Sequence, residues 1–332
     1  MSKRFIRKFI LFIGILVVIN VILDQSFKAF SVHNILNEKM DQQFAVYDDT
    51  LKYLTMGNSH NCINTHILPN SFNYGSPSEN YIQSYYKLKY ILEKSGKKPQ
   101  YLILQSDLSS YGSKISERYE YNSYWIKYID YVELARVKHD RSLLFKWLEG
   151  MFFTYAGNYK DIQLSIVYRI KMKNIEMYHG FRPHRDFKNF ADESNRQKTA
   201  WNKAQLILSK NSYFDSSIKY YFDKILNLCQ EHNVQVVLVR YPQTQEFNYE
   251  ERKIVPAAKL IKEIDSIATR YSVYRGTLDY HELFINNPDY FFDPDHLNIK
   301  GSDLLTKRLV KDLKVLESPS FAKGLSKNFS KH

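Results

Sequence analysis

LKYLTMGNS, at residues 51–59, begins as a short apolar run and ends in Gly57-Asn58-Ser59. Apolar and aromatic residues that are bounded by Gly and Asn predict a buried strand that stops at a sharp turn. A serine at the mouth of such a turn can present its hydroxyl to a cleft. The stretch therefore predicts a first strand and a candidate nucleophile, Ser59.

A second motif, Asp293-Pro-Asp-His296, lies near the end of the chain. At this spacing, one helical turn or a tight loop can bring Asp293 onto one ring nitrogen of His296 and leave the other nitrogen facing Ser59. A serine hydroxyl is a poor nucleophile unless a base lies within reach and a third group fixes the tautomer of that base. The two motifs together predict a Ser-His-Asp triad, although each alone is compatible with an ordinary turn or a surface histidine.

Further apolar segments predict a parallel sheet. Residues 78–94 have apolar side chains at helical spacing, and residues 101–105 follow as a short buried strand. The run at 234–239 is apolar almost throughout, which is typical of a central parallel strand. Alternating strands and helices predict an α/β fold. The remaining expected elements are helices at 213–232, 256–271 and 301–316 and a weak strand at 272–274.

The order of these motifs resembles the SGNH (GDSL-like) hydrolase superfamily over roughly residues 50–110 and 214–315. More narrowly, it is similar to the membrane-anchored branch that includes the D-alanyl transfer protein of lipoteichoic acid and the alginate O-acetylation proteins. The resemblance implies a three-layer α/β/α sandwich of flavodoxin-like type and an esterase or acyltransferase activity. The blocks that carry it are Gly57-Asn58-Ser59-His60, Ile67-Leu-Pro69, Phe72-Asn-Tyr-Gly75, the strand at 101–105, and Asp293-Pro-Asp-His296-Leu-Asn298.

The chain departs from the family pattern where an oxyanion would be bound. The resemblance assigns oxyanion donation to the Ser59 amide and to Gly75, with Ser78 as the alternative at the aligned position. The asparagine expected after the strand at 101–105 is replaced by a segment that contains Asp107. Loss of one oxyanion donor costs about 10²–10³ in rate. Asn58, Gly75, Ser78 and Asp107 are therefore the candidate oxyanion or substrate-binding residues.

Arg240 and His281 are two further candidates near the predicted site. Arg240 follows the strand at 234–239, and ligands of such sheets bind beyond the carboxyl ends of the strands. It is a candidate for binding an anionic substrate or an oxyanion, and a structural ion pair is the alternative. His281 is a rival base. It ranks below His296, which alone of the two has a carboxylate three residues upstream.

The N-terminus predicts a membrane anchor. The apolar run at 9–23 has fifteen residues, which as a helix rise about 22 Å. A hydrocarbon core is roughly 30 Å thick, so this run spans it only if flanking residues extend the helix. No small-x-small cleavage site follows, which favours an uncleaved signal-anchor over a signal peptide. Positive charge before the span predicts a cytoplasmic N-terminus and an extracytoplasmic body. The apolar run at 9–23 follows four basic residues, Lys3, Arg4, Arg7 and Lys8.

The expected organisation has four parts. Residues 1–29 form the cytoplasmic flank and anchor, and residues 30–50 a stalk. Residues 51–317 form the SGNH-like domain, with a helical cap inserted at about 110–213. Residues 318–332 form a disordered basic tail.

The net charge of +12 does not predict nucleic-acid binding, because no nucleic-acid motif accompanies it. It favours anionic membrane surfaces or an acidic polymer as partners. No metal motif is present, and neither a metal nor a cofactor is expected. Whether Cys62 and Cys229 pair is left open by the sequence.

The function we expect is a membrane-anchored, extracytoplasmic serine esterase or O-acyltransferase that modifies a cell-surface glycan or glycopolymer. The bilayer and the glycan are its expected partners, with a membrane-bound acyltransferase as acyl donor if the reaction is a transfer. The alternative is a catalytically inactive protein that keeps the fold to bind glycan or to scaffold a cell-envelope biosynthetic complex.

Overall fold

The computed structural model describes residues 3–30, 32–47, 50–116, 123–155, 176–182, 190–210 and 212–317. The tail predicted at 318–332 lies outside the described residues. The chain divides into two compact units by its internal contacts. The first comprises Met1–Gln42 and Tyr119–Ile175, and the second comprises Gln43–Arg118 and Glu176–His332.

A five-stranded parallel sheet forms the centre of the second unit, in the order β2-β1-β3-β4-β5. Its middle is wholly buried, because Leu54, Ile103 and Val237 from three adjacent strands have no exposed surface. The predicted α/β fold with a parallel sheet is confirmed. The strands are β1 (Tyr53–Met56), β2 (Ser71–Asn73), β3 (Tyr101–Gln105), β4 (Gln235–Arg240) and β5 (Tyr274–Asp279).

The strand predicted at 272–274 is displaced in the structure. β5 begins at Tyr274 and continues to Asp279, and most of its residues are half-buried. It lies at an edge of the sheet, so Arg275 and Gly276 can interrupt its apolar pattern without burying a charge. The prediction relied on an unbroken apolar run, so it ended the strand at Tyr274, where β5 begins.

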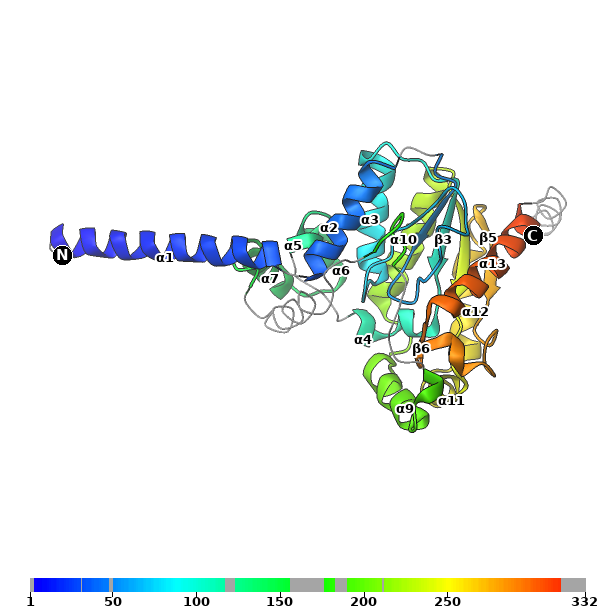
Figure 1. Ribbon diagram of the computed structural model, residues 1–332. Helices are drawn as coiled ribbons and strands as arrows, with labels where there is room; N and C mark the ends of the chain where they lie inside the picture. The colour runs from blue at the N-terminus through cyan, green and yellow to red at the C-terminus, as the bar shows by residue number, and fades with distance from the viewer. Residues whose placement is uncertain are drawn as a thin grey trace. The chain divides into compact units, whose positions relative to one another are not determined.

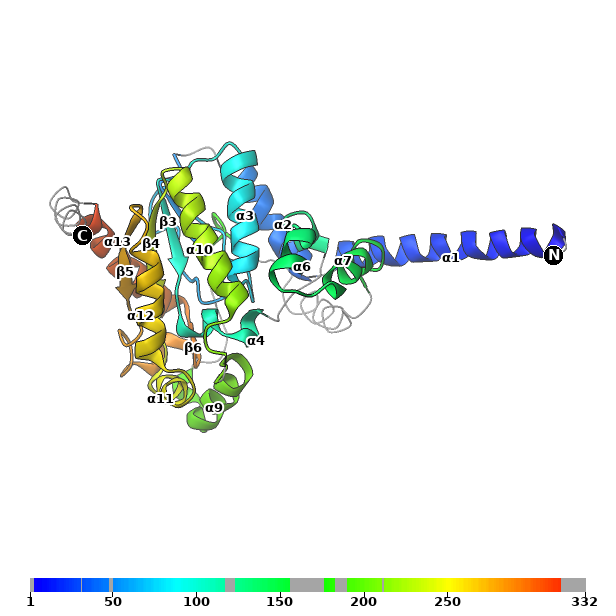
Figure 2. The ribbon, with the colours of Figure 1, turned by 180° about the vertical axis from the view of Figure 1, so that it is seen from behind.

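Helices cover both faces of the sheet (Figures 1 and 2). α3 (Tyr81–Lys94), α10 (Ser216–Glu231) and α12 (Ala257–Ala268) lie over one face, and α13 (Ile299–Leu316) lies over the other. A parallel sheet needs this cover, because both of its faces are apolar. The four predicted helices are thus confirmed, with small differences at their ends.

Local signals explain where two of these helices begin. Asn80 Oδ1 accepts hydrogen bonds from the first turn of α3, and the Asn80 amide donates to Gln83 Oε1, which completes a capping box. The Asp215 carboxylate caps α10 by accepting from two amides of its first turn.

Shorter elements connect the main ones in the second unit. They are η1 (Leu108–Tyr111), α4 (Ser113–Ser116), η2 (Phe190–Asp192), α9 (Arg196–Ile207), α11 (Gln245–Ile254), η3 (Pro288–Tyr290), β6 (Phe291–Asp293) and β7 (His296–Leu297).

The described part of the first unit is helical. α1 has 28 residues, and its most apolar window has a mean hydropathy of 2.5 and no buried residue. It is therefore long and apolar enough to cross a membrane, as either a signal anchor or a signal peptide. The helix extends beyond the predicted run at 9–23 on both sides, which supplies the missing length. The described helices that lie wholly in this unit are α1 (Lys3–Phe30), α5 (Ser123–Ile126), α6 (Tyr131–Val137) and α7 (Ser142–Phe152).

The predicted stalk and insertion are each divided between the two units. The stalk is largely a helix, α2 (Val32–Ala45), whose last residues belong to the second unit. Within that unit, the Phe44 ring packs against Phe72 and Tyr74. The insertion expected at about 110–213 is shared, since Tyr119–Ile175 belongs to the first unit and the rest to the second. A role for this insertion as a cap stays a prediction.

Candidate active site

The turn after β1 is held by Gln105 at the end of β3. Gly57 has a φ of +149°, and a Cβ atom there would lie 2.5 Å from the Gln105 side chain, so the position requires glycine. The Asn58 amide donates to Gln105 Oε1 at 2.6 Å, and Asn58 Oδ1 accepts from the His60 amide at 2.9 Å. These bonds fix the backbone on both sides of Ser59.

Ser59, His296 and Asp293 lie together at the carboxyl end of the sheet. His296 Nε2 is 2.7 Å from Ser59 Oγ, and His296 Nδ1 is 2.8 Å from Asp293 Oδ1. The loop between β6 and β7 brings Asp293 into place, because its Oδ1 also accepts from the amide of His296 at 3.0 Å. The structure thus brings together the three residues that the sequence predicts to meet.

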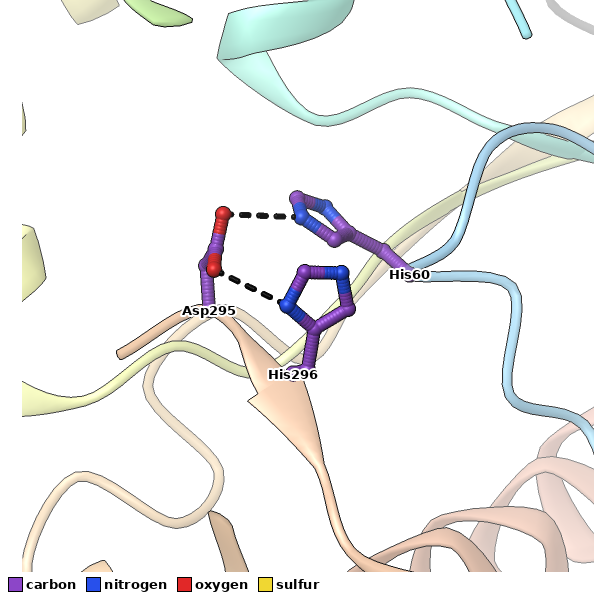
Figure 3. A group of neighbouring side chains, drawn as sticks. All are labelled: His60, Asp295 and His296. Atoms are coloured by element: carbon purple, nitrogen blue, oxygen red, sulfur yellow. Dashed lines mark hydrogen bonds and ion pairs between the residues drawn. The ribbon is translucent and has the colours of Figure 1, made fainter. Parts of the chain in front are cut away.

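A second histidine, His60, lies beside His296 (Figure 3), and its ring meets that of His296 edge to face at 4.8 Å. His60 Nδ1 lies 2.8 Å from Asp107 Oδ2, and His60 Nε2 lies 3.0 Å from Asp295 Oδ2. All three groups are buried, and the His60 side chain is 5% exposed. Although burial lowers the pKa of His60, the two carboxylates outweigh it and raise that pKa to about 10. His60 is therefore a buried imidazolium.

Asp295 joins the two histidines. Its Oδ1 lies 3.1 Å from His296 Nδ1 and 3.1 Å from Lys203 Nζ. Burial alone would raise the pKa of Asp295, but the charges and hydrogen bonds of His296 and His60 hold it well below its usual range. Burial likewise lowers the pKa of His296, and the charges of Asp295 and Asp293 reverse this, so the net pKa is raised. Asp295 is thus an ionised carboxylate with three partners.

Two donors next to the nucleophile are free to bind an oxyanion. Within the described residues, neither the Ser59 amide nor Asn58 Nδ2 donates a hydrogen bond. The Gly75 amide, by contrast, donates to Asn73 Oδ1 at 3.1 Å. Ser78 lies in the turn before α3, with a φ of +60°. Of the predicted donors, the Ser59 amide and Asn58 Nδ2 are therefore free, whereas the Gly75 amide is engaged.

Asp107 does not lie where a substrate could touch it. It has no exposed surface, and besides His60 its oxygens accept from Gln105 Nε2 at 2.7 Å and from the Tyr241 amide at 2.6 Å. Both of its oxygens are thus engaged as acceptors, so Asp107 offers no donor to an oxyanion. We therefore correct its predicted role: Asp107 orients His60.

Arg240 and His281 belong to a separate cluster. Arg240 Nη1 forms an ion pair with Asp279 Oδ2 at 2.6 Å. This is the structural ion pair named above as the alternative to a role in substrate binding. His281 Nε2 lies 3.3 Å from Glu251 Oε2 rather than near Ser59. All four side chains line a cavity of about 790 Å³. The ranking of His296 above His281 agrees with this geometry.

His60, Asp295 and His296 offer ligand atoms within 4.8 Å of one another, as a metal site would. Their chemistry does not suit a cation. Each imidazole nitrogen that faces Asp295 is already within ion-pair distance of it, and Lys203 places a positive charge 3.1 Å from its other side. We therefore assign no metal to this cluster.

Both cysteines are buried free thiols. Burial raises the pKa of Cys62 to about 12, so the thiol stays protonated at neutral pH.

Neither a scan against models of protein families nor a search of curated proteins finds a match to this chain. The geometry of the site is thus what any functional argument must rest on.

Sequence reasoning missed His60, Asp295, Lys203 and Gln105. His60 and Asp295 lie inside the two motifs that were used, and a second histidine beside the serine and a second carboxylate beside His296 were local signals for them. Lys203 and Gln105 carried no such signal, because only long-range packing brings them to the site.

Proposed function

We propose that this chain is a serine-dependent acyl-ester enzyme, an esterase or O-acyltransferase of SGNH type with a three-layer α/β/α domain. The observation that carries the proposal is the 2.7 Å contact from His296 Nε2 to Ser59 Oγ, with Asp293 on the other ring nitrogen. A histidine base held by a carboxylate and facing a serine is the arrangement that activates a hydroxyl.

In the proposed reaction, Ser59 Oγ bonds to the acyl carbonyl carbon and its proton passes to His296 Nε2. The oxyanion accepts hydrogen bonds from the Ser59 amide and from Asn58 Nδ2. The C–O bond to the alcohol then breaks, and that oxygen takes the proton from His296. Water or an acceptor hydroxyl repeats the sequence in reverse and releases Ser59.

The proposed acceptor is a cell-surface glycan or glycopolymer, and the proposed place is the outer face of a membrane with α1 as a retained anchor. The family resemblance of the motifs supports this, as does the exposed apolar surface of α1. A membrane-bound acyltransferase is the proposed donor if the reaction is a transfer.

A second candidate is a non-catalytic accessory protein that binds glycan or scaffolds an envelope complex. The engaged Gly75 amide and the absence of an asparagine after β3 favour it. The free Ser59 and Asn58 donors favour catalysis.

Fluorophosphonate labelling of the full chain in detergent tests the proposal, with the modified peptide identified by mass. We expect the label on Ser59 and its loss in Ser59→Ala and His296→Ala, while Ser78→Ala is labelled like the unsubstituted chain. A folded chain that takes no label supports the accessory role instead.

A further inference from the structure

α7 exposes a stripe of large apolar side chains. Phe145 is 74% exposed and Phe152 is 56% exposed, and Leu148 is exposed between them. Spacings of three and four residues place the three on one face of the helix. Leu143 and Gly150 are buried on the opposite face. The helix therefore presents an apolar face that the described protein does not cover.

The end of α7 is bonded to α1 within the first unit. Asn20 Nδ2 donates to the Phe152 carbonyl at 2.8 Å, and Tyr155 donates to Asn20 Oδ1 at 2.7 Å. One turn later, Asp24 Oδ1 accepts from the Thr154 hydroxyl at 2.5 Å and from its amide at 3.1 Å. Asn20 and Asp24, the polar residues towards the end of the apolar run of α1, thus both have hydrogen-bond partners among residues 152–155.

These bonds fix the level of α7 along α1. Asn20 lies inside the apolar run at 9–23 and Asp24 lies just after it, and four residues of helix rise about 6 Å. If α1 spans a bilayer, Phe152 lies where acyl chains meet headgroups. A side-chain amide there needs hydrogen-bond partners, which explains why Asn20 has two.

We infer that α7 is a second membrane contact, lying in the interface beside α1 with Phe145, Leu148 and Phe152 among the acyl chains. Lipid is favoured over a protein partner because the end of α7 is hydrogen-bonded to α1, and the apolar window of α1 has no buried residue. One bilayer covers both surfaces. The contact also gives α1 a structural role after insertion, which a cleaved signal peptide would lack.

The test uses the full chain in phosphatidylcholine vesicles, with one introduced cysteine carrying an environment-sensitive fluorophore. Cys62 and Cys229 are buried and remain unlabelled in the folded chain. Phe145→Cys and Leu148→Cys report on α7, Leu16→Cys on the anchor, and Lys198→Cys on exposed α9. We expect both α7 positions to show a blue shift and quenching by nitroxide lipids, as at Leu16.

Emission and iodide quenching like those at Lys198 would overturn the inference. Protection of both α7 positions from iodide and from nitroxide lipids would also overturn it, because it would place another part of the protein on this face.

A separate observation concerns His60, and this second inference rests on the proposed function. Asp107, His60, Asp295, His296 and Ser59 form a continuous chain with successive contacts of 2.8, 3.0, 3.1 and 2.7 Å. The first three members are buried, so each charge depends on its neighbour. The charges of His296 and His60 hold the pKa of Asp295 well below its usual range, and Lys203 Nζ lies 3.1 Å from its Oδ1.

We propose that His60, acting through Asp295, is a positioning residue for His296. His60→Gln leaves the Asp295 charge less balanced, so the His296 proton is held more firmly and the acid limb of labelling moves to higher pH. The labelling rate falls about tenfold or more, which is the size of effect seen when a hydrogen-bond partner that orients a metal-ligating histidine is removed. His281→Gln is the matched control, since it too removes a buried histidine that faces a carboxylate.

The experiment measures the rate of fluorophosphonate labelling against pH for the three chains. An unlabelled parent chain refutes the proposed function itself. A labelled parent with an unchanged rate and acid limb in His60→Gln refutes only the positioning role. A loss of folded protein without a shift of the acid limb also refutes it, because a merely structural residue would behave in that way.

Discussion

Two histidine clusters lie in the second unit, and they differ in charge although both pair a buried histidine with a carboxylate. Burial and the nearby Arg240 lower the pKa of His281 to about 4, and burial raises that of its partner Glu251 to about 8. His281 and Glu251 are therefore a neutral pair at neutral pH. Around His296 the carboxylates outweigh burial and raise its pKa. Burial alone therefore does not set the state of a histidine; the net charge of its neighbours does.

The clusters also differ in what the histidine faces. His296 Nε2 meets a serine hydroxyl, whereas His281 Nε2 meets Glu251, and within the described residues His281 Nδ1 has no hydrogen-bond partner. A nucleophile distinguishes a candidate active site from a buried polar pair. The following substitutions test that distinction.

Removing each histidine should have the largest and most unequal effect. We expect His296→Ala to lower hydrolysis of an activated ester by roughly 10³-fold or more, because the serine loses its base. His281→Ala should keep the rate within about threefold, since no step of the proposed reaction uses it. Steady-state kinetics measure both, and equal losses would refute the assignment of His296.

Replacing Asn58 should give the next largest effect. Asn58→Asp keeps the oxygen that accepts from the His60 amide but removes the Nδ2 donor and adds a negative charge. We expect kcat to fall by about 10²–10³ with little change in KM. Ser78→Ala is the control and should behave like the parent chain. An active Asn58→Asp variant would return Gly75 to consideration as the second donor.

Asp295→Asn should change the pH dependence of the rate. His296 must be neutral to accept the serine proton, and the Asp295 charge is the largest influence that raises its pKa. Without that charge the acid limb should move to lower pH. Asp279→Asn, which removes a carboxylate from the Arg240 cluster, should leave the limb in place. pH–rate profiles of kcat/KM would show a wrong assignment as a limb that does not move.

Glu251→Gln should have the smallest effect, on stability alone. The folded pKa of Glu251, about 8, exceeds its ordinary value of 4.5, so the folded state retains a proton that the unfolded state loses, and stability falls as pH rises between them. Below pH 6.5 the lowered pKa of His281 opposes this trend. The fall in the free energy of unfolding that Glu251 and His281 together cause therefore lies between pH 6.5 and 8.

We expect Glu251→Gln to abolish a fall of roughly 1–2 kcal/mol in the free energy of unfolding between pH 6.5 and 8. Denaturant unfolding at several pH values measures this change. An identical pH dependence in the parent and the variant would mean that Glu251 is ionised in the fold.

The sequence by itself determined the parallel α/β sheet, its main helices, the apolar N-terminal helix and the grouping of Ser59, Asp293 and His296. Short-range patterns suffice for these features. Apolar runs mark buried strands, helical spacing marks faces, and three residues between Asp293 and His296 allow a local turn. The two motifs and the resemblance they carry predict that Ser59 and His296 meet, and the structure places His296 Nε2 2.7 Å from Ser59 Oγ.

The tertiary structure alone decided what surrounds that triad. His60 meets carboxylates 47 and 235 positions away, and Lys203 reaches Asp295 from α9. Such contacts depend on strand register and on helix packing, which no local pattern encodes. The charge of each buried histidine follows from these distant neighbours, so sequence could name the base but not its environment.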